Sequence, residues 1–137
     1  NLGTIMRAAE AAGVTGILMS SDCVDIYNPK TIRSTMGALY RVPFVVSEDF
    51  AGDIERLKKA GVSTYAAHLG ATISYEGADY KKPCAFMIGN EANGLSDEVA
   101  ALADCKILIP MAGQVESLNA AMAATVLMFE AARQSRN

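Results

Sequence analysis

The chain has 137 residues, of which 51% are hydrophobic and 20% charged, and its net charge is −3. This length and composition fit one folded domain and exclude a disordered chain, a disulfide-stapled miniprotein and a collagen-like repeat. No apolar run approaches the ~20 residues of a membrane-spanning helix. The acidic balance argues against a uniformly basic nucleic-acid surface but leaves room for a local basic one.

Helices and strands are predicted to alternate along the chain. The expected helices cover residues 3–12, 29–39, 49–60, 96–103 and 118–134, and the expected strands cover residues 14–19, 43–46, 62–67, 84–88 and 106–109. Gly13 is the expected end of the helix 3–12, and Asn28 is the expected cap of the helix 29–39. Residues 70–83 are polar and contain glycine, which is typical of a loop. Because the strands are continuous apolar runs between helices, the pattern predicts an α/β fold whose parallel sheet is covered on both faces.

The three cysteines, Cys23, Cys84 and Cys105, are widely spaced. An odd number at such spacing predicts neither a disulfide framework nor a metal knuckle, and it favours the reducing cytoplasm. We interpret them as small core hydrophobes. The chain has one histidine, His68, so we expect no metal site, and a hydrolase triad would depend on His68 alone.

The start of the first predicted helix is the first of three stretches that could carry chemistry. Asn1 and Gly3 open this helix, and Arg7 follows within an alanine-rich sequence. A helix start offers free backbone N–H groups to an anion such as phosphate. The simpler alternative is that Arg7 is a solvated surface charge.

The second stretch, residues 88–96, follows the predicted strand 84–88 and contains Gly89 and Gly94. These glycines permit a positive φ or a close approach of the backbone. The stretch is either a ligand loop at the carboxyl end of a parallel strand, where open α/β sheets bind ligands, or a plain connection with Ser96 as a helix cap.

The third stretch, residues 107–119, has the same layout of a strand, a loop and a helix start. Ser117 could be an ordinary N-cap, with Asn119 in the first turn of the final helix. Two such loops at one edge of a sheet favour a single shared pocket.

In this order and at these separations, the three stretches resemble the SpoU (TrmH-like) branch of the SPOUT RNA methyltransferases. The stretch Asn1-x-Gly-x-x-x-Arg7 is similar to the first motif of that family, and Gly89-Asn90-Glu91-x-x-Gly94 is similar to the second. The third motif is similar to Ile109-Pro110-Met111-x-Gly113-x-x-x-Ser117-Leu118-Asn119. The resemblance covers nearly the whole chain.

The resemblance implies transfer of a methyl group from S-adenosylmethionine to a ribose 2′-hydroxyl of ribosomal or transfer RNA. It implies a parallel-sheet α/β fold with a C-terminal trefoil knot, and a homodimer in which Arg7 of one subunit approaches the cofactor of the other. Residues 1–137 would be the catalytic domain, with the first strand and any amino-terminal RNA-binding domain missing. The third motif departs from the family where it continues as Ala120-Ala121-Met122, a change that affects packing more than chemistry.

The resemblance also assigns site residues. The implied catalytic residues are Asn1, Arg7, Glu91, Ser117 and Asn119. The implied cofactor-binding residues are Gly89, Asn90, Gly94, Ile109, Met111 and Leu118, with neighbours from residues 66–70.

A separate observation predicts an RNA face. Residues 26–47 contain no acidic side chain but include Lys30, Arg33 and Arg41, which with Arg7 are the expected phosphate contacts. The alternative for this stretch is a solvated helix face. We expect neither a metal nor a membrane partner.

The resemblance also implies a role for Arg7 in the proton transfer. In the family it is proposed to remove the proton of the hydroxyl group, but arginine side chains stay protonated in proteins. We therefore expect Arg7 to bind the substrate phosphate and to orient or polarise the hydroxyl, with Glu91 as an alternative general base. A rival hypothesis is a non-catalytic α/β module that binds S-adenosylmethionine or a nucleotide, which would need neither Arg7 nor the basic stretch.

The final predicted helix is the expected dimer surface, together with the first helix. It has apolar residues at helical spacing, and Met128 would widen that surface; these residues are Leu118, Met122, Val126, Phe129 and Ala132. A single domain could instead bury them in its own core. The resemblance favours the pairing of two chains.

Overall fold

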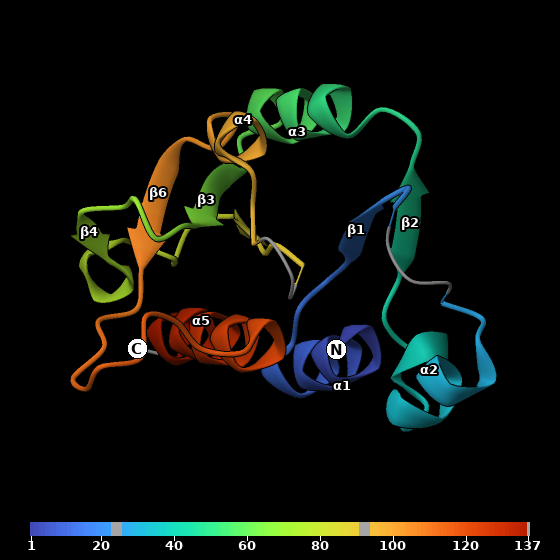
Figure 1. The fold of residues 1–137 in the computed structure, drawn as a ribbon. Coiled ribbons are helices and arrows are strands. Elements are labelled where there is room, and N and C mark those ends of the chain that lie inside the picture. Colours follow the sequence, from blue (N-terminus) through green and yellow to red (C-terminus); the bar gives the residue numbers. More distant parts are fainter. Residues whose placement is uncertain (23–25, 91–93, 137) are drawn as a thin grey trace. The chain divides into compact units, whose positions relative to one another are not determined.

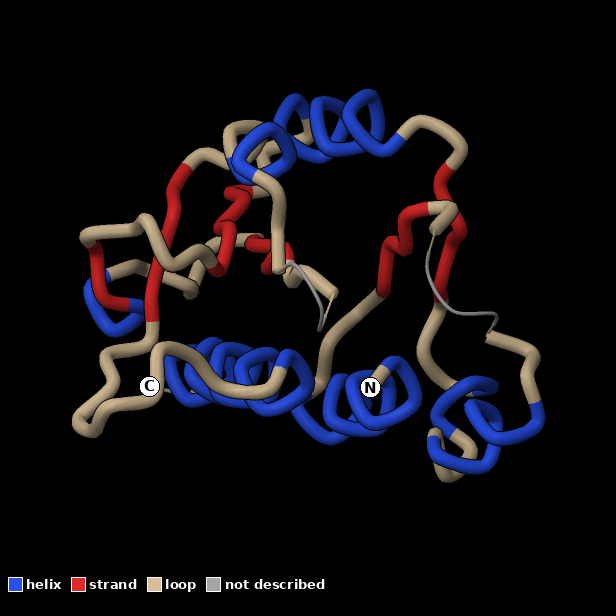
Figure 2. Tube along the Cα trace, in the orientation of Figure 1, coloured by secondary structure: helices blue, strands red, loops and turns tan. Residues whose placement is uncertain are grey.

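The computed structural model describes residues 1–22, 26–90 and 94–136 (Figure 1). Cys23 and Glu91 therefore lie outside the described residues. The chain divides into two compact units, Asn1–Phe50 and Ala51–Asn137. Both units contain helices and parallel strands, so the predicted α/β class is confirmed (Figure 2). None of the described helices is long and apolar enough to cross a membrane.

The first unit is a two-stranded parallel sheet with its own helices. Its elements are α1 (Leu2–Ala12), β1 (Ile17–Ser20), α2 (Pro29–Ser34), the 3-10 helix η1 (Ala38–Tyr40) and β2 (Phe44–Ser47). Strands β1 and β2 pair in parallel, with Ile17 opposite Phe44. Met6 is fully buried in the core of this unit, whose other buried members are Met19, Ile26, Ala38, Leu39 and Val42.

Local sequence explains where these helices begin and end. Helix α1 buries Gly3, Met6 and Ala9, and this spacing of three places one face of the helix in the core. It ends at Gly13, which adopts a left-handed φ of +82°. Helix α2 begins at the predicted cap, where the Asn28 side chain accepts a hydrogen bond from the Lys30 N–H at 2.9 Å.

The predicted helix 29–39 is interrupted, which corrects the sequence interpretation. Helix α2 ends at Ser34, and η1 follows as a separate short turn. Met36 and Gly37 have φ values of +53° and +90°, which a right-handed helix cannot accommodate. Gly37 adopts a positive φ readily, which allows the chain to leave the helix at this point.

In its described residues, the second unit is a four-stranded sheet with three α-helices. Helices α3 (Phe50–Lys59), α4 (Asp97–Ala100) and α5 (Ala120–Ser135) accompany strands β3 (Ser63–Ala67), β4 (Ile73–Ser74), β5 (Cys84–Met87) and β6 (Cys105–Leu108). The 3-10 helix η2 (Tyr75–Gly77) follows β4. The strand order is β4-β6-β3-β5, and every pairing in it is parallel.

Strand β4 lies within residues 70–83, which were predicted to be a loop, so that prediction is wrong at this point. It consists of two residues, and Ile73 pairs with Ile107 of β6. Two residues are too few to produce a hydrophobic period, and their pairing depends on a strand far along the chain.

Parallel pairing brings the carboxyl ends of β3, β5 and β6 to one edge of this sheet. Strand β3 lies between the other two, so the segments that follow all three strands are neighbours there. Helix α5 packs against β5 and buries Leu127 completely. The sheet therefore places the predicted ligand loops at one edge, on either side of the segment that follows β3.

Candidate functional site

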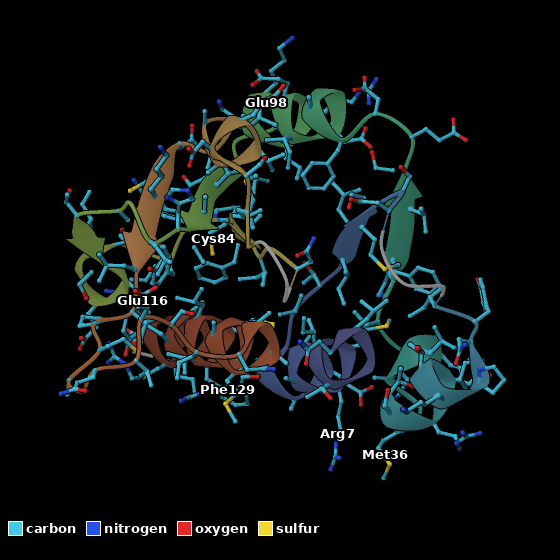
Figure 3. All side chains as sticks on the ribbon, in the orientation of Figure 1. Arg7, Met36, Cys84, Glu98, Glu116 and Phe129 are labelled. Carbon is cyan, nitrogen blue, oxygen red and sulfur yellow. The ribbon has the colours of Figure 1, made fainter. Side chains whose placement is uncertain are left out.

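Arg7 lies on the exposed face of α1 and its side chain projects away from the helix (Figure 3). Within the part of the chain that the structure describes, its guanidinium has no ion-pair partner. Asn1 is the N-cap of this helix, and its backbone carbonyl accepts a hydrogen bond from the Ile5 N–H at 2.8 Å. Both residues belong to the first unit.

Gly3 has a packing role that the sequence analysis missed. A Cβ atom on Gly3 would overlap the side chain of Ser34 and would lie 2.9 Å from the carbonyl oxygen of Thr31. Gly3 therefore allows α1 to approach α2 closely. A glycine inside a helix disfavours helix formation, so its presence there was the signal for such an approach.

The loop after β5 folds back on itself. A Cβ atom on Gly89 would overlap the backbone of Gly94 and Leu95. Gly94 has a φ of +62°, and its N–H donates a hydrogen bond to the Asn90 carbonyl at 3.0 Å. Ser96 then caps α4 as predicted, because its hydroxyl accepts a hydrogen bond from the Val99 N–H at 3.1 Å. Glu91, predicted to be catalytic, lies outside the described residues.

The loop after β6 contains the predicted cofactor residues Ile109, Met111 and Leu118, all of which are half-buried. The N-cap of α5 is Asn119 rather than Ser117. The Asn119 Oδ1 accepts hydrogen bonds from the N–H groups of Ala121 and Met122, at 2.9 and 3.3 Å. This corrects the suggestion that Ser117 caps the helix.

Ser117 is exposed and precedes the cap. Its hydroxyl makes no hydrogen bond within the described ranges. The two polar residues therefore differ: Asn119 has a structural task, whereas the Ser117 hydroxyl is available to a ligand.

His68 follows β3 and lies between the two loops in the order of the sheet. Its Nδ1 accepts a hydrogen bond from the Gly70 N–H at 3.0 Å, so the neutral ring carries its proton on Nε2. That Nε2 lies 2.9 Å from Oδ1 of Asp97, the first residue of α4. The pair ties the end of β3 to the end of the loop after β5. The sequence suggested residues 66–70 as neighbours of the cofactor but contained no sign of this partner.

The predicted RNA contacts differ in their surroundings. Lys30 and Arg33 are exposed on α2, and neither forms an ion pair with another described residue. Arg41 instead pairs with Glu10 of α1, with 2.8 Å between its Nη2 and Oε1 of Glu10, and its Nε bonds to the other carboxylate oxygen. The hydrogen bond from Arg41 holds the pKa of Glu10 below its ordinary value.

Helix α5 exposes part of the predicted dimer surface. Met122 and Phe129 are 62% and 42% exposed. Met128 is only 8% exposed, so the expectation that it widens this surface is wrong. It lies next to Leu127, on the face that is packed into the second unit.

A shallow hollow of about 390 Å³ lies elsewhere in the second unit, between η2 and the end of α5. Its lining includes Glu76, Asp79 and Arg133, and none of the predicted cofactor residues contributes to it. Over residues 1–22, 26–90 and 94–136, no three histidine, cysteine or acidic side chains gather in a group that could hold a metal ion. The two glycine-bearing loops and His68 therefore remain the candidate site of this unit.

Comparison with known proteins finds matches over nearly the whole chain. The family model described as "SpoU rRNA Methylase family" matches residues 1–129. An uncharacterized tRNA/rRNA methyltransferase from Synechocystis is 39% identical over 98% of this chain and 49% of its own length. The Bacillus subtilis protein RlmP, a 23S rRNA (guanosine-2′-O)-methyltransferase, is 33% identical over 94% of this chain and 52% of its own length.

A solved structure also matches. The SpoU methyltransferase AviRb from Streptomyces viridochromogenes, in complex with the cofactor AdoMet, aligns with a TM-score of 0.87 and 35% identity. The alignment covers 97% of this chain and 55% of that one. The chain thus spans about half the length of the relatives that it matches. Because the family model covers most of its residues, the chain belongs to the SpoU rRNA methylase family.

Proposed function

We propose that the chain is the catalytic part of an RNA 2′-O-ribose methyltransferase that uses S-adenosylmethionine. The observation that carries this proposal is the folded-back loop at Gly89, which lies at the same sheet edge as the loop after β6. The family supports the reaction class, and the names of its relatives support ribosomal RNA as the substrate.

The two loops of the second unit fit the cofactor. Gly89 leaves no room for a side chain and brings backbone N–H and C=O groups together, as a site that binds through the main chain requires. Asn90 and Gly94 belong to the same loop, and the half-buried side chains of Ile109, Met111 and Leu118 supply apolar contacts. When bound, the cofactor supplies an electrophilic methyl group on its sulfonium.

Arg7 is the proposed contact for the substrate phosphate. Its exposed guanidinium can bind a phosphate through two parallel hydrogen bonds, and it would orient the neighbouring ribose hydroxyl in line with the methyl group. Such alignment can contribute several kcal/mol, up to about 7–11. The Ser117 hydroxyl can accept or donate a hydrogen bond to the ribose, while Lys30 and Arg33 bind phosphates further along the RNA.

A shared active site requires two chains, and we propose a homodimer. The exposed apolar residues Met122 and Phe129 on α5 support this, because apolar side chains at helical spacing suit a helix interface. A sedimenting species of only 14.5 kDa at micromolar concentration would contradict it. The trefoil knot, the extent of the catalytic domain over residues 1–137 and a cytoplasmic location stay predictions, the last supported by the free thiols of Cys84 and Cys105.

The function is tested with the Arg7→Ala variant. We expect it to lose methyl transfer to RNA while its affinity for S-adenosylmethionine, measured by calorimetry, stays nearly unchanged. Arg7→Lys should restore little activity, because an ammonium group cannot make the two parallel bonds. The control is Arg56→Gln, which removes another exposed arginine, on α3, and should keep full activity.

Mixed dimers test the shared site. A chain with Arg7→Ala, combined with a chain disabled at Gly89, should recover part of the activity because one of the two sites then keeps both intact halves. No recovery despite confirmed subunit exchange would leave Arg7 as an RNA-binding or structural charge. If the unaltered protein binds S-adenosylmethionine but methylates nothing in total cellular RNA, the chain is a binding module and the enzyme proposal fails.

A further inference from the structure

Arg41 joins two segments of the first unit through one side chain. Its guanidinium forms the bidentate pair with Glu10 of α1, and the same Nη2 also donates a hydrogen bond to the Met36 carbonyl at 3.2 Å. It packs against Gly37 as well, since a Cβ there would lie 2.8 Å from its Nη1. We call Glu10, Arg41 and the backbone at residues 36–37 the arginine clamp.

The turn inside the clamp is held in an unfavourable shape. Met36 is the one non-glycine among the described residues with a positive φ, and Gly37 follows it with another. The Met36 side chain is 64% exposed, so its own packing does little to maintain this conformation. The hydrogen bond that Arg41 donates to the Met36 carbonyl stabilises this conformation. A conformation of this kind persists where surrounding contacts impose it, and such sites are often functional.

The other end of the clamp is on the helix that carries Arg7. Glu10 follows Arg7 by three residues, which is close to one helical turn. Gly3 provides the second close contact of α1, against Ser34 of α2. Figure 3 shows the Arg7 and Met36 side chains projecting from the same side of this unit. Movement of α1 against residues 34–41 would therefore displace the guanidinium of Arg7.

We propose that Glu10 and Arg41 are positioning residues for Arg7, and that Arg41 acts on the protein rather than on an RNA phosphate. This inference rests on the proposed methyltransferase function. Two of the five N–H groups of Arg41 face the Glu10 carboxylate, which neutralises its charge locally. Lys30 and Arg33, which have no such partner within the described ranges, remain the phosphate contacts of this face.

The Glu10→Gln variant separates the two roles of Arg41. It weakens the clamp but leaves the arginine in place with its charge unpaired. If Arg41 positions α1, kcat should fall about 10- to 100-fold, the size of effect expected from a small misplacement of a catalytic group. The affinity for S-adenosylmethionine should stay within about twofold, and the KM for RNA should rise no further than it does in Arg7→Ala, because the RNA contact that the displacement affects is that of Arg7.

Arg41→Gln should reproduce the loss in kcat, and its RNA affinity should keep the salt dependence of the unaltered protein. The double variant Glu10→Arg with Arg41→Glu restores the ion pair in reverse and should recover part of the kcat. Amide hydrogen exchange over residues 35–42 should accelerate in both single variants and slow again in the double variant. The matched control, Arg56→Gln on α3, removes one partner of another exposed ion pair and should change neither kcat nor this exchange.

The opposite pattern overturns the inference. Arg41→Gln could raise the KM for RNA and lower by about one the slope of the logarithm of RNA affinity against the logarithm of salt concentration. If Glu10→Gln at the same time leaves RNA binding unchanged or tightens it, Arg41 contacts a phosphate. Unchanged kcat in both single variants overturns the positioning role but leaves the proposed function standing. If the unaltered protein transfers no methyl group to RNA, the proposed function fails and the inference fails with it.

Discussion

The two units of the molecule hold their candidate functional residues in place by different contacts. In the first, Arg7 lies on a helix that is held by an ion pair and by a close contact at Gly3. In the second, the loops after β5 and β6 are shaped by their own backbone, with Gly89 against Gly94 and Asn119 capping α5. We therefore expect the first unit to be impaired by substitutions that change a charge or move a helix. The second unit should instead be impaired by substitutions that add atoms to the loops or remove backbone hydrogen bonds.

Gly89→Val should have the largest effect in the second unit. The new side chain cannot coexist with the backbone of residues 94–95, so the loop must open. We expect calorimetry to detect no binding of S-adenosylmethionine. Gly77→Ala is the matched control, because a Cβ there meets only Ile73, at an ordinary distance of 3.9 Å. Normal binding by Gly89→Val would remove this loop from the cofactor site.

Gly3→Ala tests steric sensitivity in the first unit. The added methyl group would overlap Ser34, and we expect a loss of about 1–3 kcal/mol in the free energy of unfolding, as is usual for overpacking. Denaturant titration measures this loss. Ser34→Gly in the same chain should return part of the stability, because it removes the side chain that the methyl group strikes. A stable Gly3→Ala protein would show that α1 and α2 are not tightly packed.

Asp104 tests the hydrogen bonds that support the sheet of the second unit. Its Oδ2 accepts hydrogen bonds from the N–H of the fully buried Thr64, at 2.9 Å, and from its hydroxyl, at 3.1 Å. Asp104→Ala leaves the buried Thr64 groups without this acceptor, which should cost about 1–3 kcal/mol in the free energy of unfolding. A cost near zero would mean that water replaces the carboxylate.

The same carboxylate gives a pH dependence with a defined sign. The hydrogen bonds from Thr64 are the main cause that lowers the pKa of Asp104 from its ordinary 3.8. Its ionised form therefore stabilises the fold above pH 3.8, and this contribution is lost as the pH falls through the lowered value. Asp104→Asn keeps an acceptor but cannot ionise. The stability difference between the two proteins should be constant near neutral pH and should shrink only in acid below pH 3.8.

Asn119→Ala and Ser117→Ala should give the smallest and most selective effects. Removing the Asn119 cap should cost about 1 kcal/mol in the free energy of unfolding, whereas Ser117→Ala should leave stability unchanged. Thermal unfolding provides the measurement. If Ser117 contacts the ribose, its variant should instead lose methyl transfer. Equal stability losses in the two variants would contradict the assignment of the cap to Asn119.

The sequence predicted features that depend on neighbouring residues. The cap at Asn28, the left-handed end of α1 at Gly13 and the cap at Ser96 are all present, because capping involves groups only two or three positions apart. The three motifs were recognised for a similar reason, since their spacing along the chain carries the signal. The loops of the second and third motifs do follow predicted strands.

Contacts between distant segments could not be predicted in this way. The pairing of Ile73 with Ile107, the Glu10–Arg41 pair and the His68–Asp97 pair each join residues from different elements. The basic stretch shows the consequence most clearly. Its charges identified Lys30, Arg33 and Arg41 as one group of phosphate contacts. Arg41 differs because it pairs with the Glu10 carboxylate, which belongs to α1 and lies far away in the sequence.

The strand order of the second unit also has a consequence for folding. Strand β3 lies between β5 and β6, where Thr64 pairs with Ala85 and Tyr65 pairs with Cys105. Both partners are synthesised well after β3, so β3 remains unpaired during that time. Strand β4 likewise cannot pair until β6 has been synthesised. Parallel sheets closed by such distant pairings form slowly, because loop entropy is lost before the contacts are gained. We expect this sheet to complete only after Leu108 has left the ribosome exit tunnel, with the edges of β3 open to misfolding or chaperone binding until then.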